Sequence, residues 1–373
     1  MRNLRIVLCT GIDKACKLEL LRKVQACASA SGKGQVHVYD LWESIRKVAE
    51  SKGYSGSRIR ITDLPPEELE LLRELACVRV AEDFDTRIRG ASDRSWHVAL
   101  LHTRTISPRR SGFVKTLDKT QLALDPEDCW SVIDNVESMH ANLLNDPVWS
   151  SHVSNLDQVL DRRQEEIANT EHWCDENIGS RHHYLIAAKE SPETLLGLLF
   201  PLAGAKEKKG KVYLSFPITH ADEKIKKRKQ EFVARLRQHY VVFDPFSVTE
   251  YDVAFSRYQM ANASAEKQSQ RAWLEKLGAV TVDNDYRLVK QSDGVVVFYP
   301  SMAVKVEDSN GEWIDAEQKI LSAGVMAEMI YASRLQRTVE ALWLSDKVPS
   351  PFFTQHCSSP VFKSEEEFFK HLG

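Results

Sequence analysis

The chain has 373 residues, of which 43% are hydrophobic and 28% charged, and its formal net charge is −3. This length favours two domains, and the weak net charge argues against direct binding of nucleic acid. No apolar run approaches the roughly 20 residues of a membrane span, and the start "MRNLRIVLCTG" lacks the pattern of a signal peptide. We therefore expect a cytoplasmic protein that binds no membrane.

The seven cysteines are scattered along the chain and form no C-x-x-C pair. Zinc sites and disulfide frameworks place their cysteines at recognisable spacings, and this sequence has no such spacing. We therefore expect no metal site, no disulfide framework and no cofactor.

Strands and helices alternate along the first half of the chain. "LRIVLCTG" (4–11) has the pattern of a buried strand, and a helical segment follows it. "GQVHVYDLWESIRKVAES" repeats this order, and "SWHVALLHTR" (95–104) supplies a further strand. Residues 126–146 read as a helix, and 182–189 read as a late strand that precedes a short helix. Such alternation predicts a doubly wound α/β sheet.

Residues 205–210, "AKEKKG", are the best candidate for a linker because they are polar, charged and end in glycine. We therefore assign 1–204 to an N-terminal domain and 211–373 to a compact second α/β domain. The elements expected in the second domain are strands at 211–216, 240–246, 294–300 and 338–344, helices at 222–239, 254–277, 285–291 and 322–335, and a polar hairpin-like insertion after the third strand.

The first strand ends in a loop that almost matches a phosphate-binding motif. Gly11 and Lys17 in "GIDKACK" are in register with G-x-x-x-x-G-K-[ST], but Cys16 replaces the second glycine and Leu18 replaces the hydroxyl residue. In the motif, glycines let backbone N–H groups surround a phosphate, and the hydroxyl holds magnesium. The loss of the second glycine and of the hydroxyl residue argues against ordinary ATP turnover. The alternative to a phosphate-binding loop is a plain strand–turn–helix in which the lysine is incidental.

This order of elements, with "WHVALLHTR" and "LDPEDCWSVIDNVESMHANLLNDP", resembles the P-loop adenylate-kinase-like family. The resemblance implies that 1–204 form a kinase-like parallel sheet whose phosphate loop has degenerated. It also implies that Gly11 and Lys17 are the residues to test for nucleotide binding. Assembly without catalysis is an equally consistent role for this domain.

Three residues in the second domain form the main candidate site: Tyr213, Asp285 and Glu328. Taken singly, they could be a core tyrosine, a helix N-cap and a solvent-facing glutamate. The neighbours of Glu328 argue against the last alternative, because "VMAEMIYA" leaves little polar surface around it. A carboxylate held against apolar walls suits catalysis.

Together, "KVYLSFPITHADEK", "NDYRLVKQSDGVVVFYP" and "SAGVMAEMIYA" resemble the nucleoside 2-deoxyribosyltransferase family. The family has a tyrosine on a strand, an aspartate eight residues before a second one, and a helix start of the form [DS]-x-G-x-x-x-E-x-G-x-A. The residues in register with this pattern are Tyr213, Asp285, Asp293, Ser322, Gly324, Glu328 and Ala332.

The resemblance implies a flavodoxin-like fold and a role for each matched residue. Glu328 would attack C1′ of the sugar, Asp285 would serve the base and sugar as an acid, and Tyr213 would orient the nucleophile. Asp293 would belong to the substrate-binding residues. A carboxylate stabilises the oxocarbenium-like state of N-glycosidic cleavage, and a second acid protonates the departing base.

Ser322 favours a nucleotide substrate. The transferases of this family carry aspartate at this position, whereas the branch that hydrolyses 2′-deoxynucleoside 5′-monophosphates resembles this chain in having serine. A serine followed by Gly324 at an electropositive helix start suits a 5′-phosphate. Ser215 and His220 in "SFPITH" are further candidates for the phosphate, and Ile330 departs from the glycine of the pattern.

We therefore expect an N-glycosidase that releases free base from (deoxy)nucleoside 5′-monophosphates. A deoxyribosyltransferase, a TIR-like NAD glycohydrolase and a non-catalytic nucleotide sensor are the alternatives. The expected partner is a small-molecule nucleotide, and the resemblance implies a homo-oligomer. Base preference and the choice between deoxyribose and ribose stay open.

Overall fold

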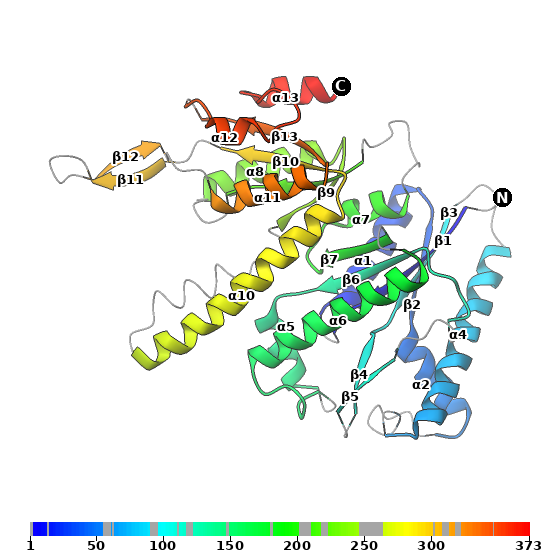
Figure 1. Ribbon diagram of the computed structural model, residues 1–373. Coiled ribbons are helices and arrows are strands. Elements are labelled where there is room, and N and C mark those ends of the chain that lie inside the picture. The colour runs from blue at the N-terminus through cyan, green and yellow to red at the C-terminus, as the bar shows by residue number, and fades with distance from the viewer. Residues whose placement is uncertain are drawn as a thin grey trace. The chain divides into compact units, whose positions relative to one another are not determined.

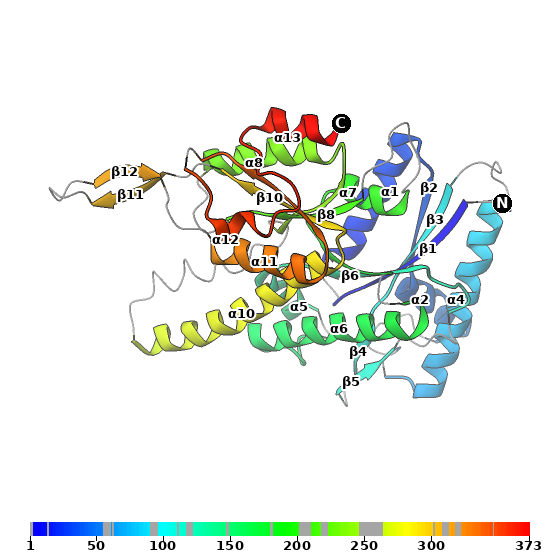
Figure 2. The ribbon, with the colours of Figure 1, turned by 45° about the horizontal axis from the view of Figure 1, so that its top comes forward.

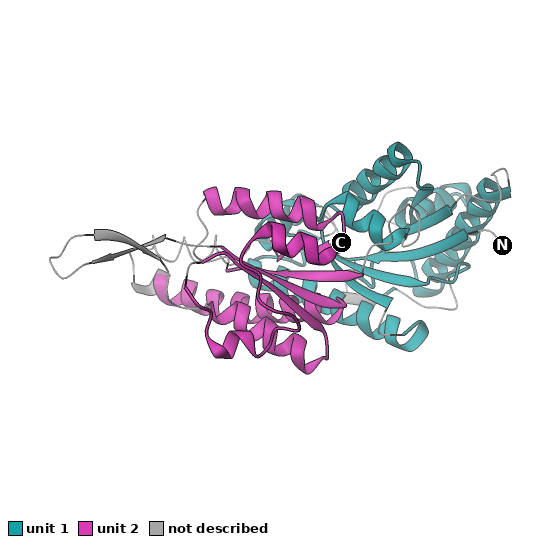
Figure 3. Ribbon diagram, turned by 90° about the horizontal axis from the view of Figure 1, so that it is seen from above, with its two compact units in different colours: residues 1–204 teal, residues 205–373 magenta. Residues whose placement is uncertain are grey.

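The computed structural model describes residues 3–12, 15–54, 61, 63–89, 96–109, 112–116, 122–146, 149–179, 182–200, 210–217, 223–245, 264–300, 303–307, 313–317, 322–345 and 347–373. The chain divides into two compact units, Met1–Gly204 and Ala205–Gly373, which Figure 3 colours teal and magenta. Each unit contains its own parallel sheet, so the protein is α/β as expected. Within the described part, no helix is both long and apolar enough to cross a bilayer.

Unit 1 is built on a five-stranded parallel sheet with the strand order β2-β3-β1-β6-β7 (Figure 1). Its strands are β1 (Asn3–Thr10), β2 (Gln35–Asp40), β3 (Trp96–His102), β6 (Asp128–Ile133) and β7 (His183–Ala187), with a separate antiparallel hairpin of β4 (Ile106–Arg109) and β5 (Gly112–Lys115). Its described helices are α1 (Lys17–Ser31), α2 (Leu41–Ser51), α4 (Pro66–Arg89), α5 (Val136–Leu144), α6 (Leu156–Asn177) and α7 (Pro192–Leu199).

Helices cover both faces of the unit 1 sheet. Helices α4 and α6 share a buried cluster with one face, where Phe84 and Trp173 pack against Leu8 of the central strand. Helices α1 and α7 pack against each other on the opposite face (Figure 2). This two-sided cover explains why the strands are nearly continuous apolar runs.

The expectation of one helix over 126–146 is wrong. Residues Asp128–Ile133 form strand β6, which pairs with β1 and β7, and only Val136–Leu144 are helical. The whole of β6 is buried. A short run buried on both sides carries no period of two, so its pattern does not separate a strand from a buried helix.

Unit 2 has a four-stranded parallel sheet with the order β13-β10-β8-β9. Its strands are β8 (Lys211–Ser215), β9 (Val241–Phe243), β10 (Gly294–Tyr299) and β13 (Thr338–Trp343), and its described helices are α8 (Glu223–Leu236), α10 (Ser264–Lys290), α11 (Ala323–Arg334), α12 (Pro351–Thr354) and α13 (Glu365–Leu372). The insertion after β10 is an antiparallel hairpin of β11 (Ala303–Glu307) and β12 (Trp313–Glu317), which confirms the hairpin expected there.

Alternation along β8 decides which side chains meet which helices. Val212 and Leu214 belong to the apolar cluster that α8 and α13 cover, together with Phe232 and Phe368. Because successive side chains of a strand point to opposite faces, Tyr213 and Ser215 point to the other face. Helices α10 and α11 cover that face, and both contact the sheet (Figure 2).

We expected two separate helices at 254–277 and 285–291. In the described part of this region, which begins at residue 264, the structure has a single helix. Helix α10 runs without a break from Ser264 to Lys290, so Asp285 lies inside it and is not an N-cap. The β-branched residues of "GAVTVDND" disfavour a helix locally, but Thr281 donates its hydroxyl to the carbonyl of Leu277, and Arg287 pairs with Asp283 at 3.0 Å. Tertiary packing overrides the weak propensity.

Candidate functional site

Two hydroxyl groups from β8 hold the carboxylate of Glu328. The hydroxyl of Tyr213 donates a hydrogen bond of 2.9 Å to Oε1, and the hydroxyl of Ser215 donates to Oε2. All three side chains are at least nine-tenths buried: Tyr213 is 1% exposed, Ser215 0% and Glu328 9%. A buried carboxylate is tolerated when both oxygens accept hydrogen bonds, and this arrangement also fixes its direction.

Helix α11 delivers Glu328 to the sheet. Val325, Met329 and Ala332 are buried on the same helix, at spacings that share the inward-facing side with Glu328. The apolar neighbours that drew attention in the sequence therefore bury the helix against the sheet. They also carry the carboxylate inward with them.

Asp285 reaches the same cluster from helix α10. Its half-buried carboxyl group is hydrogen-bonded to the Tyr213 hydroxyl, which also donates to Glu328. A phenol has one proton to donate, so the two carboxyl groups share the Tyr213 hydroxyl, and the contact lowers the pKa of Asp285 because it favours the ionised carboxylate. The three residues then form a hydrogen-bonded chain in the order Asp285, Tyr213, Glu328.

The two carboxyl groups hold protons far more strongly than free side chains do. Burial raises the pKa of Asp285 to about 7, against a smaller lowering by the hydrogen bond with Tyr213. Burial and then the neighbouring charge of Asp285 raise the pKa of Glu328 to about 8, although the bonds from Ser215 and Tyr213 oppose this. The pair therefore shares one proton near neutral pH and titrates as a unit.

An aromatic contact fixes the two helices that carry these carboxyl groups. Tyr286 of α10 and Tyr331 of α11 lie with ring centroids 4.4 Å apart at an angle of 33°. Tyr286 is the neighbour of Asp285, and Tyr331 lies one turn beyond Glu328. The sequence pattern did not single out these tyrosines, because their pairing depends on how the helices pack.

The start of α11 is open. Ser322 is the N-cap residue, but its side chain makes no capping hydrogen bond. Gly324 is exposed, and a Cβ atom added there would meet only the Ser322 hydroxyl oxygen, at 3.7 Å. Nothing in the packing of the described residues therefore requires glycine at this position, and the backbone is accessible one turn before Glu328.

The other predicted site residues are placed differently. Asp293 lies at the amino end of β10, where its carboxylate accepts the Lys211 N–H at 2.8 Å, and it is not part of the Glu328 cluster. The hydroxyl of Ser215 serves the carboxylate of Glu328, whereas the sequence analysis assigned it to a phosphate. His220 lies outside the described residues.

The almost-matching loop of unit 1 turns its lysine inward. Lys17 begins helix α1, is 3% exposed, and donates to the carbonyl oxygen of Gly11 and, at 2.7 Å, to that of Thr103. Cys16, at the lost glycine position, has φ of +50°, a left-handed conformation that glycine adopts without strain. The ammonium group is therefore bound to backbone carbonyls of its own unit.

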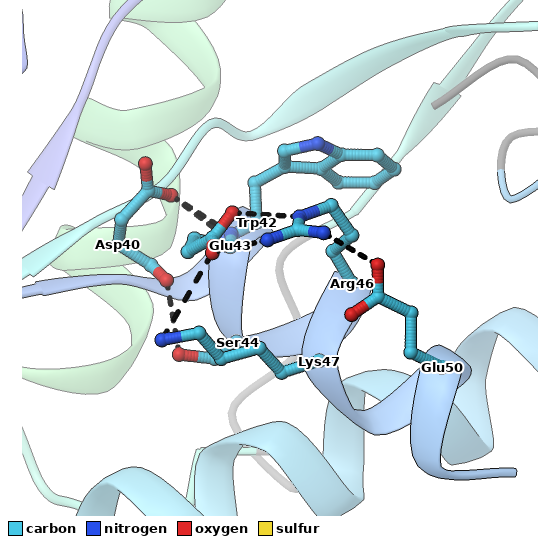
Figure 4. A network of polar contacts seen from close by, with 7 residues as sticks. All are labelled: Asp40, Trp42, Glu43, Ser44, Arg46, Lys47 and Glu50. Carbon is cyan, nitrogen blue, oxygen red and sulfur yellow. Dashed lines mark hydrogen bonds and ion pairs between the residues drawn. The ribbon is translucent and has the colours of Figure 1, made fainter. Parts of the chain in front are cut away.

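A polar cluster that the sequence pattern did not indicate lies at the carboxyl ends of β2 and β3. Asp40 caps helix α2 by accepting from the Trp42 and Glu43 N–H groups (Figure 4). Its other neighbour is His102, 3.4 Å away, which ends β3 and is opposite Asp40 in the sheet register. Burial raises the pKa of Asp40. The contact with His102 and the hydrogen bonds from the helix N–H groups lower it by more, so the pKa lies below its usual value.

This cluster continues onto an aromatic side chain. The guanidinium of Arg104, which is 7% exposed, lies 5.1 Å from the centroid of the Trp42 ring. One sequence signal could have indicated this cluster: two of the expected strands end in polar residues. These strands are neighbours in the sheet, where ligands bind at the carboxyl ends of the strands. Strand pairing is a long-range property, however, and was not readable from either segment.

No model of a known protein family and no curated protein matches the sequence. Within the described ranges, no group of three or more histidine, cysteine, aspartate or glutamate side chains is arranged to hold a metal ion. The geometry of the carboxylate cluster is therefore the main guide to function.

The raised pKa values predict how stability depends on pH. Glu328 and Asp285 bind protons more tightly in the folded than in the unfolded chain, so the stability they contribute is complete below about pH 4 and is lost as pH rises through about 7 to 8. We expect Glu328→Gln to lose less stability than the wild type as pH rises, because glutamine does not ionise. The difference in the free energy of unfolding should be on the order of 2 kcal/mol.

The measurement is the calorimetric melting temperature of the wild type and the variant between pH 5 and pH 9. Glu366→Gln, at an exposed position of helix α13, is the matched control. A Glu328→Gln melting temperature that falls with pH as steeply as the wild type's would contradict the assignment of a proton to this cluster.

Proposed function

We propose that unit 2 hydrolyses the N-glycosidic bond of nucleoside 5′-monophosphates, deoxy or ribo, to free base and sugar 5-phosphate. The observation that carries the proposal is the placement of Glu328. Its carboxylate is held by two hydroxyl groups, Tyr213 and Ser215, beside a second carboxyl group on Asp285. This is an oriented nucleophile next to a proton donor, the pair that glycosidic cleavage needs.

The strand order supports a ligand at this place. Strand β8 leads to β9 on one side, and the chain then crosses to β10 on the other, as in the flavodoxin-like order 2-1-3-4. In such sheets, ligands bind outside the carboxyl ends of the strands where the order reverses. Ser215 is the last residue of β8, directly at this point.

In the proposed reaction, an oxygen of Glu328 attacks C1′ of the sugar as the bond from C1′ to the base nitrogen breaks. The electron pair of that bond goes to the base, which takes the one proton of the pair from Asp285. The higher pKa of Glu328 places this proton on Glu328 in most molecules, so the reactive form is the one in which the proton has moved to Asp285 and Glu328 is ionised. The product is an ester between Glu328 and the sugar. Asp285, now ionised, then removes a proton from water, and the hydroxide attacks C1′ to release the sugar and restore the carboxylate.

Tyr213 and Ser215 act on the nucleophile. Their hydroxyl groups keep the carboxylate in one orientation and lower the pKa of Glu328, which burial and Asp285 raise. The aligned anion therefore costs little to reorganise when it attacks. The resemblance to the deoxyribosyltransferase family assigns the same orienting role to Tyr213.

The start of α11 is the proposed phosphate site. The uncapped Ser322 hydroxyl and the exposed backbone at Gly324 are one turn from Glu328. A helix start favours an anion because its first N–H groups lack partners within the helix. A 5′-phosphate bound there would leave C1′ of the same nucleotide within reach of Glu328.

The remaining features of the protein are proposed on the resemblances alone. Unit 1 would be a degenerate kinase-like domain, and unit 2 would assemble as a homo-oligomer in which neighbouring copies border the site. Neither feature is needed for the chemistry assigned to Glu328 and Asp285.

Incubation of the full chain with a panel of nucleotides tests the reaction. Chromatography would measure free base released from deoxy and ribo nucleosides, their 5′-monophosphates, and NAD. We expect release from monophosphates, and a loss of at least about a thousandfold in rate for Glu328→Gln, because the amide is not a nucleophile. Glu366→Gln should keep full activity.

Other outcomes of the panel identify other functions. Release of base from NAD alone would replace the proposal with a TIR-like glycohydrolase, and exchange of bases between free nucleosides would replace it with a transferase. Tight binding of nucleotides without any turnover would indicate a sensor.

The pH profile of kcat/KM should be bell-shaped with its maximum between about pH 7 and pH 8, where the pair holds one proton. Below this range both carboxyl groups are protonated and Glu328 cannot attack, and above it neither group holds a proton for the departing base. Asp285→Asn should lower the rate, remove the alkaline limb, and move the acidic limb to lower pH because the negative neighbour is gone. An unchanged alkaline limb in this variant would show that another group is the acid.

Ser322→Asp tests the phosphate site. The added charge should raise KM for monophosphates by about tenfold or more, whereas any activity on free nucleosides should change little. Ser322→Ala is the matched control, since it removes the hydroxyl without adding charge. An equal effect of Ser322→Asp on both substrate classes would count against a phosphate at this helix start.

A further inference from the structure

The loop that ends β1 in unit 1 makes an unusually close approach to the neighbouring strand. Gly11 has φ of +133°, and a Cβ atom at this position would collide with the carbonyl oxygen of Val132 in β6. Only glycine lets the backbone pass here without displacing that strand. The N–H group of Gly11 consequently faces the interior of the unit.

A carboxylate of the same chain meets this N–H group. Glu166 of helix α6 is 1% exposed, and its Oε1 accepts hydrogen bonds from the N–H groups of Gly11 at 3.2 Å and Thr105 at 2.6 Å. Its Oε2 accepts from the N–H group of Ile106 at 3.0 Å. Three backbone donors, from the segments that follow β1 and β3, therefore converge on one anion, which is the geometry of an oxyanion site.

Lys17 is the counter-ion of this carboxylate. Burial raises the pKa of Glu166, and the positive charge of Lys17 is the largest effect that opposes the rise. The ammonium group donates to the carbonyl oxygens of Gly11 and Thr103, which belong to the same two loops. The charge of Lys17 therefore partly offsets that of Glu166, and backbone groups bond the polar atoms of both side chains.

Helix α6 is tied to β1 one turn beyond Glu166. The hydroxyl of Thr170 donates to the carbonyl of Glu166 at 2.8 Å, and the hydroxyl groups of Thr170 and Thr10 lie 2.6 Å apart. Thr10 is the last residue of β1, immediately before Gly11. The contact fixes the rotation of the helix, so the carboxylate is presented to the loop in one position.

We propose that the N–H groups of Gly11, Thr105 and Ile106 form an oxyanion site whose ligand is Glu166 of the same chain, with Lys17 as the internal counter-ion. The carboxylate fills the place that the loop would offer to a phosphate, so unit 1 takes no nucleotide phosphate there. A phosphate added to the intact site would meet the charge of Glu166 and would find the Gly11, Thr105 and Ile106 donors already used.

Removing the internal ligand should open the site to external anions. Titration calorimetry of the full chain with pyrophosphate, and separately with magnesium-ATP, would compare the wild type with Glu166→Gln and Glu166→Ala. We expect Glu166→Ala to bind pyrophosphate at least about tenfold more tightly than the wild type, a difference of about 1.4 kcal/mol. Glu166→Gln should gain less, because its amide oxygen still accepts from the same donors. Glu165→Gln is the matched control, because Glu165 is adjacent on α6 but its side chain is 42% exposed and pairs with Arg162.

Chemical rescue supplies a second readout if the vacated site lowers stability. Acetate should raise the melting temperature of Glu166→Ala more than that of the wild type or of Glu165→Gln, since it restores a carboxylate to the three donors. The pyrophosphate and ATP arms distinguish a site for any small oxyanion from one that also accepts a nucleotide.

Two results would overturn the proposal. One is wild-type binding of pyrophosphate or magnesium-ATP as tight as in the Glu166 variants and abolished by Lys17→Met. The other is a Glu166→Ala protein that folds, binds no anion more tightly than the wild type and gains nothing from acetate. Either result would show that Glu166 does not occupy an anion site.

Discussion

The cost of burying a carboxylate organises both units of this protein. An ionised carboxyl group inside a folded chain must recover, from donors and counter-charges, what it loses in water. Glu328 in unit 2 and Glu166 in unit 1 are both more than nine-tenths buried, and both lie next to the loops or strand ends at the carboxyl edge of a parallel sheet. The two carboxylates offset the cost of burial with different partners, and these partners indicate different roles.

Glu166 is satisfied by rigid groups. Its partners are three backbone N–H groups, and a buried ammonium group compensates its charge. Glu328 is satisfied by two side-chain hydroxyl groups, and the neighbouring carboxyl group of Asp285 has the same sign of charge. The backbone donors around Glu166 are best satisfied when its carboxylate stays permanently in place. The cluster around Glu328 holds a shared proton and leaves the carboxylate suited to reaction. We therefore assign chemistry to Glu328 and a structural role to Glu166.

The site in unit 2 depends on the packing that brings two helices together over one strand. The apolar cluster on the far face of the sheet commits Val212 and Leu214 to that side, which leaves Tyr213 and Ser215 for α10 and α11. The contact between the tilted rings of Tyr286 and Tyr331 then holds α10 against α11. Precise placement of the acid relative to the nucleophile follows from these contacts.

The sequence by itself determined the α/β class and the residue types of the cluster, because a glutamate among apolar neighbours and a tyrosine on a buried strand are local patterns. It did not determine that β6 is a strand, that α10 is continuous through Asp285, or that Asp293 pairs with Lys211 away from the site. It also gave no sign of Glu166, since a charged stretch such as "DRRQEE" normally marks the exposed side of a helix. Only the tertiary structure decided these points, because each depends on which segments pack against one another, and packing over long sequence distances outweighs local propensity.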